Sequence, residues 1–254
     1  MVINEDQSNR NLQKSKTNLL SSLNHHFETC TVVYIMSLKS LLKNIQEELM
    51  KKEEARQGLQ RDMRKATRLS KQAILFAHQE RFDEAKKLLQ EASKLLSKLN
   101  DISKNHPELI YTGLVNAAFE EYTEAHVLLV LIKEDRFISP AELGVSSVSY
   151  VLGLADVVGE FRRRALDSIR RGDVETAEKC MQIMEQIYVE LTAMDDAFLL
   201  VSGLRRKCDV ARRLIEITRG DVTIETRRSS LERSIKELEK TIRRKIKVGK
   251  TENR

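Results

Sequence analysis

Apolar residues recur at helical spacing along most of this 254-residue chain, whereas the alternation typical of strands is weak. A clear pattern opens at Met36, runs through SLKSLLKNIQEELMKK and continues to about residue 79. Further helices are predicted at about 83–104, 108–133, 147–171, 174–196 and 204–218. With only 9 glycines and 2 prolines to interrupt these stretches, the predicted fold class is all-α.

Turn-forming residues mark the expected helix ends. His106 is followed by a proline, which disfavours the α conformation and predicts the end of the second helix. Residues 139–142, Ser-Pro-Ala-Glu, combine an N-cap serine, a proline at the first helical position and a glutamate at the third. A short helical turn that ends at Gly144 is therefore predicted, and Asp173 is predicted to cap the helix that follows it.

The pattern divides the chain into three parts. Residues 1–35 form a poorly patterned N-terminal leader, either disordered or an extension upstream of a start at Met36. Residues 36–222 carry the pattern of a single helical domain, and residues 223–254 form a charged helical tail. An apolar stripe predicts that this tail docks on its own domain or on a partner, while its basic end leaves nucleic-acid affinity as an alternative. The stripe consists of Leu231, Ile235, Leu238, Ile242 and Ile246.

The charge balance favours an anionic partner. Lys and Arg total 44 against 38 for Asp and Glu, which gives a net charge of +6 and a pI near 9.2. Cys30, Cys180 and Cys208 are odd in number and widely spaced, a pattern more typical of reduced cytosolic thiols than of disulfides. No secretory signal and no apolar run long enough for a bilayer is visible, so we predict a cytoplasmic protein without membrane contact.

Several familiar chemistries have no support in this sequence. There is no glycine-rich phosphate loop, no Ser-His-Asp arrangement and no CxxC pair, which argues against NTPase, serine-hydrolase and zinc-finger functions. His78, His106 and His126 do not have the spacing of metal ligands, so structural roles are expected for them.

Two acidic pairs interrupt apolar helical faces. Glu121 and Glu124 are separated by three positions and Asp156 and Glu160 by four, so each pair shares one side of its helix. Carboxylates on packed faces are costly to desolvate; these groups therefore either point to solvent or are neutralised by basic side chains or a cation. Four carboxylates from two facing helices would suit Mg²⁺ or Mn²⁺.

A basic stripe precedes them in the sequence RDMRKATRLSK. Its cations follow the helical spacing of one face: Arg61, Arg64, Lys65, Arg68 and Lys71. The opposite face is small and able to pack: Met63, Ala66, Ser70, Ala73 and Ala77. Such a stripe is either a solvated helix face or a surface for a phosphate backbone. Further cations follow Gly203, and some of them are expected to pair with acids: Arg205, Arg206, Lys207, Arg212 and Arg213.

Six segments occur in an order that points to a known family. They are RDMRKATRLSKQAI, HPELIYTGLVNAAFEEYTEAHVL, ISPAELGV, YVLGLADVVGEFRRRAL, RRGDVETAEKCMQIMEQIY and GLRRKCDVARRLIEITRGDVT. Over about residues 40–222 the chain resembles the translin family, and LADVVGE and GLRRK-x-DVAR are the most specific parts of the resemblance.

The resemblance extends to the acidic motifs of one branch. Members of the translin-associated factor X type carry an ExxE motif and a DxxxE motif of the form ADxxGE. Glu121 and Glu124 occupy the first motif here, and Asp156 and Glu160 the second. The resemblance therefore implies that these four acids are catalytic and hold the metal, as in an archaeal-type, nuclease-competent member. The ExxE spacing selects Glu121 over the neighbouring Glu120.

The resemblance also carries expectations about assembly and function. It implies a bundle of about seven helices and a hollow homo-oligomer, commonly an octamer, with the stripe from Arg61 to Lys71 facing RNA. The function expected is that of an Mg²⁺-dependent endoribonuclease that cleaves single-stranded RNA within the oligomeric shell. The alternative is a non-catalytic translin-like protein that binds RNA or single-stranded DNA.

Overall fold

The computed structural model describes residues 5–99, 102, 104, 107–109, 112–194 and 196–251. For residues 5–37, 108, 197 and 244–251 it describes the backbone only. The chain divides into two units, residues 1–57 and 58–254. The first unit contributes the N-terminal part of one helix, and all the tertiary packing considered below lies in the second.

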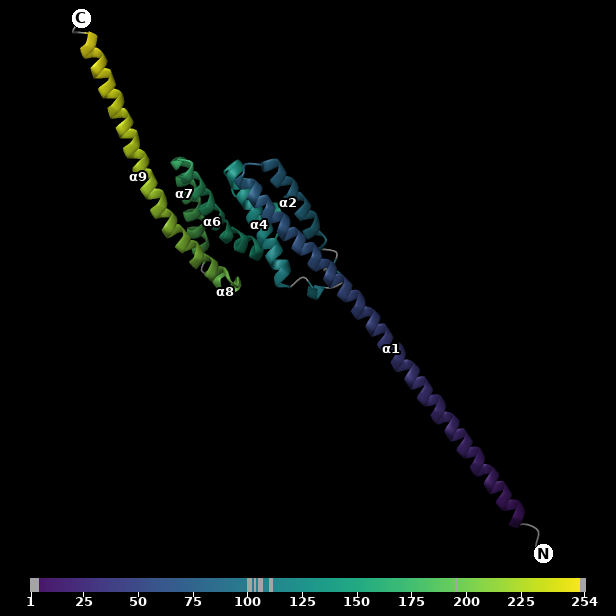
Figure 1. Cartoon of the computed structure of the whole chain (residues 1–254). Helices are drawn as coiled ribbons and strands as arrows, with labels where there is room; N and C mark the ends of the chain where they lie inside the picture. Colours follow the sequence, from purple (N-terminus) through teal and green to yellow (C-terminus); the bar gives the residue numbers. More distant parts are fainter. Residues whose placement is uncertain are drawn as a thin grey trace. The chain divides into compact units, whose positions relative to one another are not determined.

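The described residues form eight α-helices and one 3-10 turn, and no strand, which confirms the all-α prediction (Figure 1). Two of the helices, α5 and α8, are single turns, so the long helices are close in number to the bundle that the resemblance implies. In chain order the elements are α1 (Glu5–His78), α2 (Phe82–Ser97), η1 (Pro107–Leu109), α4 (Gly113–Glu134), α5 (Pro140–Leu143), α6 (Ser147–Arg170), α7 (Val174–Thr192), α8 (Ala197–Leu200) and α9 (Leu204–Thr251).

Several helix ends differ from those predicted. α4 begins at Gly113 rather than near residue 108, because residues 107–109 form a 3-10 turn and Thr112 is extended, with φ −97° and ψ 146°. α9 continues through Gly220, whose cost of about 1 kcal/mol relative to alanine does not break a long helix. The single-turn helix α8 was not predicted.

The predicted boundaries at both ends of the chain have no counterpart in helix ends. α1 is continuous from Glu5 through Met36, and α9 is continuous through residue 222. The predicted stop at residues 105–106 lies outside the described residues. The division into leader, domain and tail therefore stays a prediction.

Helix α6 is the centre of the second unit, since it packs against α4, α7 and α9. Its apolar residues Val157, Val158 and Phe161 are at most 2% exposed. Burying side chains of this size contributes roughly 1.5–3 kcal/mol each before the entropy of ordering is subtracted. In α1, the small face predicted to pack is buried as expected: Met63, Ala66, Ser70, Ala73 and Ala77 are at most 1% exposed.

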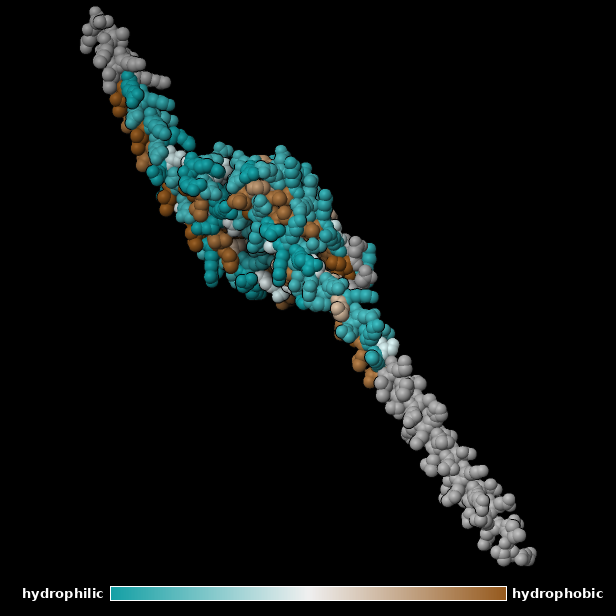
Figure 2. All heavy atoms as spheres, turned by 45° about the vertical axis from the view of Figure 1, so that its right-hand side comes forward, coloured by the Kyte–Doolittle hydropathy of each residue, from teal (hydrophilic) through white to brown (hydrophobic). Residues whose placement is uncertain are grey.

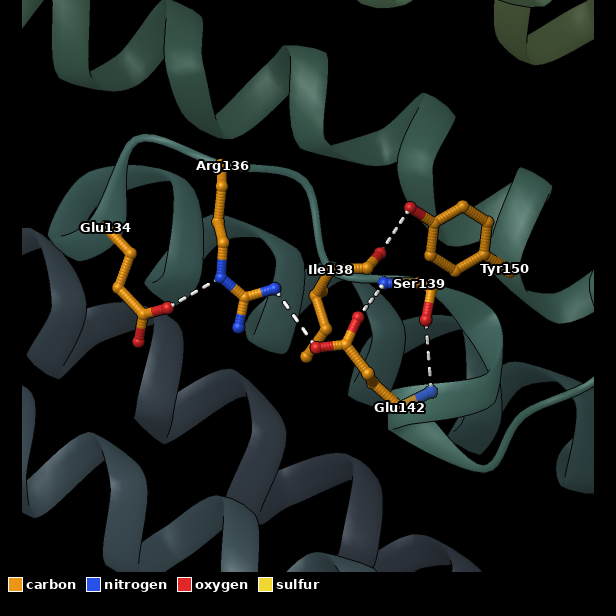
Figure 3. Close-up of polar contacts among 6 residues, drawn as sticks. All are labelled: Glu134, Arg136, Ile138, Ser139, Glu142 and Tyr150. Atoms are coloured by element: carbon orange, nitrogen blue, oxygen red, sulfur yellow. Dashed lines mark hydrogen bonds and ion pairs between the residues drawn. The ribbon is translucent and has the colours of Figure 1, made fainter.

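The connection between α4 and α6 is held by polar contacts (Figure 3). Ser139 and Glu142 form the predicted capping box: the backbone N–H of Glu142 donates to Ser139 Oγ (3.2 Å), and that of Ser139 donates to Glu142 Oε2 (2.8 Å). Arg136 donates to the same glutamate (3.1 Å), and the Tyr150 hydroxyl on α6 donates to the carbonyl of Ile138 (2.6 Å). These contacts satisfy the loop backbone and tie the first turn of α6 to it.

None of the helices in the described part of the chain has an apolar stretch long enough to cross a membrane.

Candidate functional site

Helices α4 and α6 touch backbone to backbone beside the acidic pairs. A Cβ added to Gly153 would lie 2.7 Å from the carbonyl oxygen of Glu120 and 2.7 Å from Cβ of Thr123. Thr123 is fully buried there and donates its hydroxyl to the carbonyl of Phe119 (2.8 Å). Only glycine permits this approach, which confirms the close packing expected near Gly153. Gly159 is different, because its added Cβ would meet only Leu214 Cδ1, at 4.0 Å.

This crossing brings the four predicted acids into one cluster. Burial, together with the negative charges of Asp156, Glu121 and Glu160, raises the pKa of Glu124 to about 8. Both acidic pairs therefore act electrostatically on one carboxyl group, as expected if they face each other. We call these four side chains the acidic cluster. Their catalytic and metal-binding roles stay predictions.

A lysine from α9 neutralises one side of the acidic cluster. The ammonium of Lys207 contacts Asp156 Oδ2, donates to Glu120 Oε2 (2.8 Å) and lies 3.3 Å from the carbonyl oxygen of Leu152. Burial raises the pKa of Asp156, although Lys207 opposes that shift. Glu120, which the ExxE spacing does not select, therefore shares the ammonium group of Lys207 with Asp156.

Helix α1 supplies two further partners. His78 Nε2 lies 2.6 Å from Glu160 Oε2 with only 5% of its side chain exposed, and Lys71 Nζ lies 3.2 Å from Glu121 Oε1. The expectation of a purely structural role misses this contact of His78 with the cluster. A signal was present, because Lys71 and His78 are seven positions apart and so share one face of α1.

The fit of a divalent cation is incomplete in this arrangement. The cluster offers hard carboxylate oxygens, which Mg²⁺ and Mn²⁺ prefer. Yet within the part of the chain that the structure describes, no three His, Cys, Asp or Glu side chains converge so as to hold a metal ion. Lys207, Lys71 and His78 contact oxygen atoms that such an ion would need. The donor chemistry fits the metal and the present side-chain geometry does not.

The basic stripe of α1 divides into paired and free cations. Lys65 pairs with Glu91 (2.6 Å) and Lys71 with Glu121. The other three, Arg61, Arg64 and Arg68, are exposed, and none forms an ion pair with another described residue. We call these three arginines the basic face. Its guanidinium groups remain open to an external anion.

Two histidines and the cysteines remain from the residues considered in the sequence. Burial lowers the pKa of His126 to about 4, and its ring packs edge-on against Tyr122 at 4.7 Å, in keeping with a structural role. His106 and the side chain of Cys30 lie outside the described residues. Cys180 and Cys208 are free and buried, as expected for reduced thiols, and burial raises the pKa of Cys180 to about 11.

Comparison with known proteins identifies the family. Residues 9–219 match the Translin family, and the chain belongs to that family. The match covers the acidic motifs and all six segments of the resemblance except residues 220–223, and it begins within the stretch predicted as a leader.

Two relatives differ in the length of chain over which they match. The chain is 34% identical to an uncharacterized protein of Methanocaldococcus jannaschii over 141 residues, which are 55% of this chain and 62% of that protein. It is 34% identical to translin-associated protein X of Pongo abelii over 55 residues, which are 22% of this chain and 19% of that protein. The matches thus span less than two thirds of either relative's length.

Solved structures support the same fold. One is apo-NeC3PO, with a TM-score of 0.66 and 29% identity over 72% of this chain and 96% of that one. Another is a complex of AfC3PO with duplex RNA, with a TM-score of 0.64 and 35% identity over 73% of this chain and 96% of that one. The helical arrangement is therefore that of translin-like proteins.

Proposed function

We propose that this chain is a metal-dependent endoribonuclease of the translin-associated factor X type, which cleaves single-stranded RNA within an oligomer. The observation that carries the proposal is the acidic cluster, where burial and the charges of three other carboxylates raise the pKa of Glu124 to about 8. A nearby cation would favour the ionised form of such a carboxyl group. The relative whose solved structure contains duplex RNA supports RNA as the substrate class.

The acidic cluster would hold the ion, Mg²⁺ or Mn²⁺, through the four side chains that the motifs contain: Glu121, Glu124, Asp156 and Glu160. When bound, a divalent ion supplies positive charge and a water molecule of lowered pKa. Lys207 and His78 would first have to release their carboxylates, because they contact Asp156 and Glu160. The cluster is thus proposed to exchange internal cations for an external one.

The basic face would hold the RNA backbone. Its three arginines are exposed and free of ion pairs with described residues, so they can meet phosphates without breaking an internal contact. Lys65 and Lys71, which were predicted to bind RNA with them, would each have to leave a carboxylate. We therefore expect the arginines to contribute more than the lysines.

Exposed apolar residues support self-association. One set lies on α1: Leu38, Leu41, Leu42, Ile45, Leu49 and Met50, all at least 48% exposed. Another follows α9 and appears as a line of hydrophobic residues along its C-terminal part (Figure 2): Ile217, Ile224, Leu231, Ile235, Leu238 and Ile242, all at least 49% exposed. Contiguous apolar surface of this kind marks interaction sites. A homo-oligomer is the proposed partner arrangement, with the octamer as the size to test by native mass spectrometry.

The function is tested by incubating the purified protein with end-labelled RNA, as single strand and as duplex, in Mg²⁺ or in EDTA. We expect internal cleavage of the single strand in Mg²⁺ and none in EDTA. Asp156→Asn and Glu124→Gln should each lower the cleavage rate by at least about 100-fold. Glu190→Gln, an exposed acid on α7, is the matched control and should cleave like the wild type. Cleavage that survives in EDTA or in both cluster variants would refute the proposal.

A second candidate function is nucleic-acid binding without catalysis. It is favoured by one observation, namely that Lys207, Lys71 and His78 already pair with the acidic cluster. This alternative predicts RNA or single-stranded DNA binding without cleavage in any metal. For the nuclease and for the non-catalytic binding protein alike, Arg64→Gln should lower the slope of log affinity against log salt by about 0.7 for single strands, because one phosphate contact is lost.

A further inference from the structure

A pocket of about 320 Å³ lies between α6 and α9. Its apolar wall comes from small or aliphatic residues of both helices: Ala155, Gly159, Ala211 and Leu214. Asp156 and Lys207 also line it, so the pocket borders the acidic cluster directly. Gly159 keeps this space open because it has no Cβ.

The charged groups of the pocket are not equivalent. Lys207 pairs with both Asp156 and Glu120, so its ammonium already has two carboxylate partners and is not free for an external anion. Arg206 is exposed, lines the pocket and forms no ion pair with any residue that the structure describes. The pocket therefore combines an apolar wall with one guanidinium group that has no ion-pair partner among the described residues, although its charge acts on Asp156. An occupant that fits has a flat, largely apolar body and an anionic group beside it.

We propose that this pocket is a nucleotide subsite, in which Arg206 binds a phosphate and the wall at Gly159 receives the attached nucleoside. This inference rests on the proposed function, because an RNA strand at the acidic cluster would place a neighbouring nucleotide at the pocket that shares Asp156. The volume is at the lower end of the roughly 300–1,000 Å³ typical of ligand pockets, which suits one nucleotide.

The lining residues also predict whether the subsite distinguishes one base from another. No aromatic side chain is among its lining residues in the described part of the chain, so it lacks the usual stacking platform for a base. Contact with Ala155, Ala211 and Leu214 depends on shape and apolar area rather than on hydrogen bonds to base edges. Purine and pyrimidine nucleotides are therefore expected to bind with similar affinity.

The subsite is tested by calorimetric titration of AMP and UMP into the full chain in EDTA, so that no metal is involved. Saturable binding of both nucleotides is expected, while adenosine alone and inorganic phosphate alone should bind at least about tenfold more weakly. Arg206→Gln should weaken AMP binding by about fivefold. Loss of a buried charged contact would weaken it more, but this guanidinium group is exposed. Gly159→Val should abolish it by filling the pocket.

Arg212→Gln is the matched control, since Arg212 is exposed on the same helix but does not line the pocket. It should bind AMP within about twofold of the wild type. Equal losses in the Arg206 and Arg212 variants, inorganic phosphate binding as tightly as AMP, or no saturable binding of AMP would each overturn the subsite. If Gly159→Val fails to fold, the two arginine variants alone decide the question.

The two proposals fail in different ways. AMP binding in EDTA together with no RNA cleavage in Mg²⁺ would remove the nuclease and support a nucleotide-binding pocket. RNA cleavage that Asp156→Asn abolishes, together with no AMP binding, would remove the subsite and leave the nuclease in place.

Discussion

Helix α6 meets two of its neighbours, α4 and α9, in different ways. Against α4 it comes so close that Gly153 has no room for a Cβ, whereas against α9 it leaves a pocket beside Gly159. The two glycines are six positions apart and so lie on different sides of one helix. On the close side, the carbonyl oxygen of Glu120 and the side chain of Thr123 lie directly against Gly153. On the side of the pocket, Lys207 reaches Asp156, and space remains for a ligand.

This difference explains why acids of similar spacing have different environments. Glu124 lies at the close contact, and no other described residue forms an ion pair with it; burial and three like charges raise its pKa. Asp156 borders the pocket, where Lys207 and Arg206 counteract the effect of burial on its pKa. Burial raises the pKa of both carboxyl groups, and the charges beside each group decide how far it is raised.

The largest expected effect concerns Glu124 and pH. Because the pKa of Glu124 is about 8 in the folded chain and near its ordinary value of 4.5 in the unfolded chain, the folded state keeps this proton up to a higher pH. The free energy of unfolding should therefore fall as pH rises from about 5 to 8, by up to about 1.4 kcal/mol per pH unit. Glu124→Gln should lack this fall, so its stability relative to wild type should increase with pH in urea unfolding without metal.

The exposed acid variant Glu190→Gln serves as the control and should follow the wild-type pH profile. If the free energies of unfolding of Glu124→Gln and wild type differ by a constant amount from pH 5 to 8, the fold does not raise the pKa of Glu124.

The next effect concerns the two glycines themselves. Gly153→Ala should lower the free energy of unfolding by about 1–3 kcal/mol, because the new methyl group would overlap Glu120 and Thr123 of α4. Gly159→Ala should be neutral or stabilise by up to about 1 kcal/mol, since its Cβ has room and alanine favours the helix. Equal effects of the two substitutions in chemical denaturation would contradict the contrast between the two sides of α6.

The smallest effect concerns Lys207, which lines the pocket between α6 and α9. Lys207→Met should destabilise by about 1–2 kcal/mol at pH 8, because Asp156 and Glu120 lose their shared cation while staying partly solvated. The loss should be smaller at pH 5, because burial raises the pKa of Asp156 and the carboxyl group left without its cation can take up a proton.

Its control is Lys179→Met, which removes a surface ion pair with Glu175 (3.2 Å) and should cost less than about 0.5 kcal/mol. If both lysine variants lose the same stability, Lys207 has no special part in neutralising the cluster.

Local features of the fold could be read from the sequence because neighbouring residues determine them. The capping box at Ser139 and the cap at Asp173, which accepts from the backbone N–H of Thr176 (3.1 Å), need only residues three positions away. Gly144 and Gly172 end their helices with φ values of +66° and +76°, which favour glycine. The start of α4 was misplaced because the 3-10 turn before it has no such local signal.

The sequence by itself determined the helical class, most caps and the pairing of acids within each helix, since helical geometry places residues three or four positions apart on one side. Only the tertiary structure decided which cation meets which acid. Lys207 is 87 positions from Glu120, and His78 is 82 positions from Glu160. Such contacts depend on how closely the helices pack, and a missing Cβ at Gly153 sets that distance where α4 meets α6.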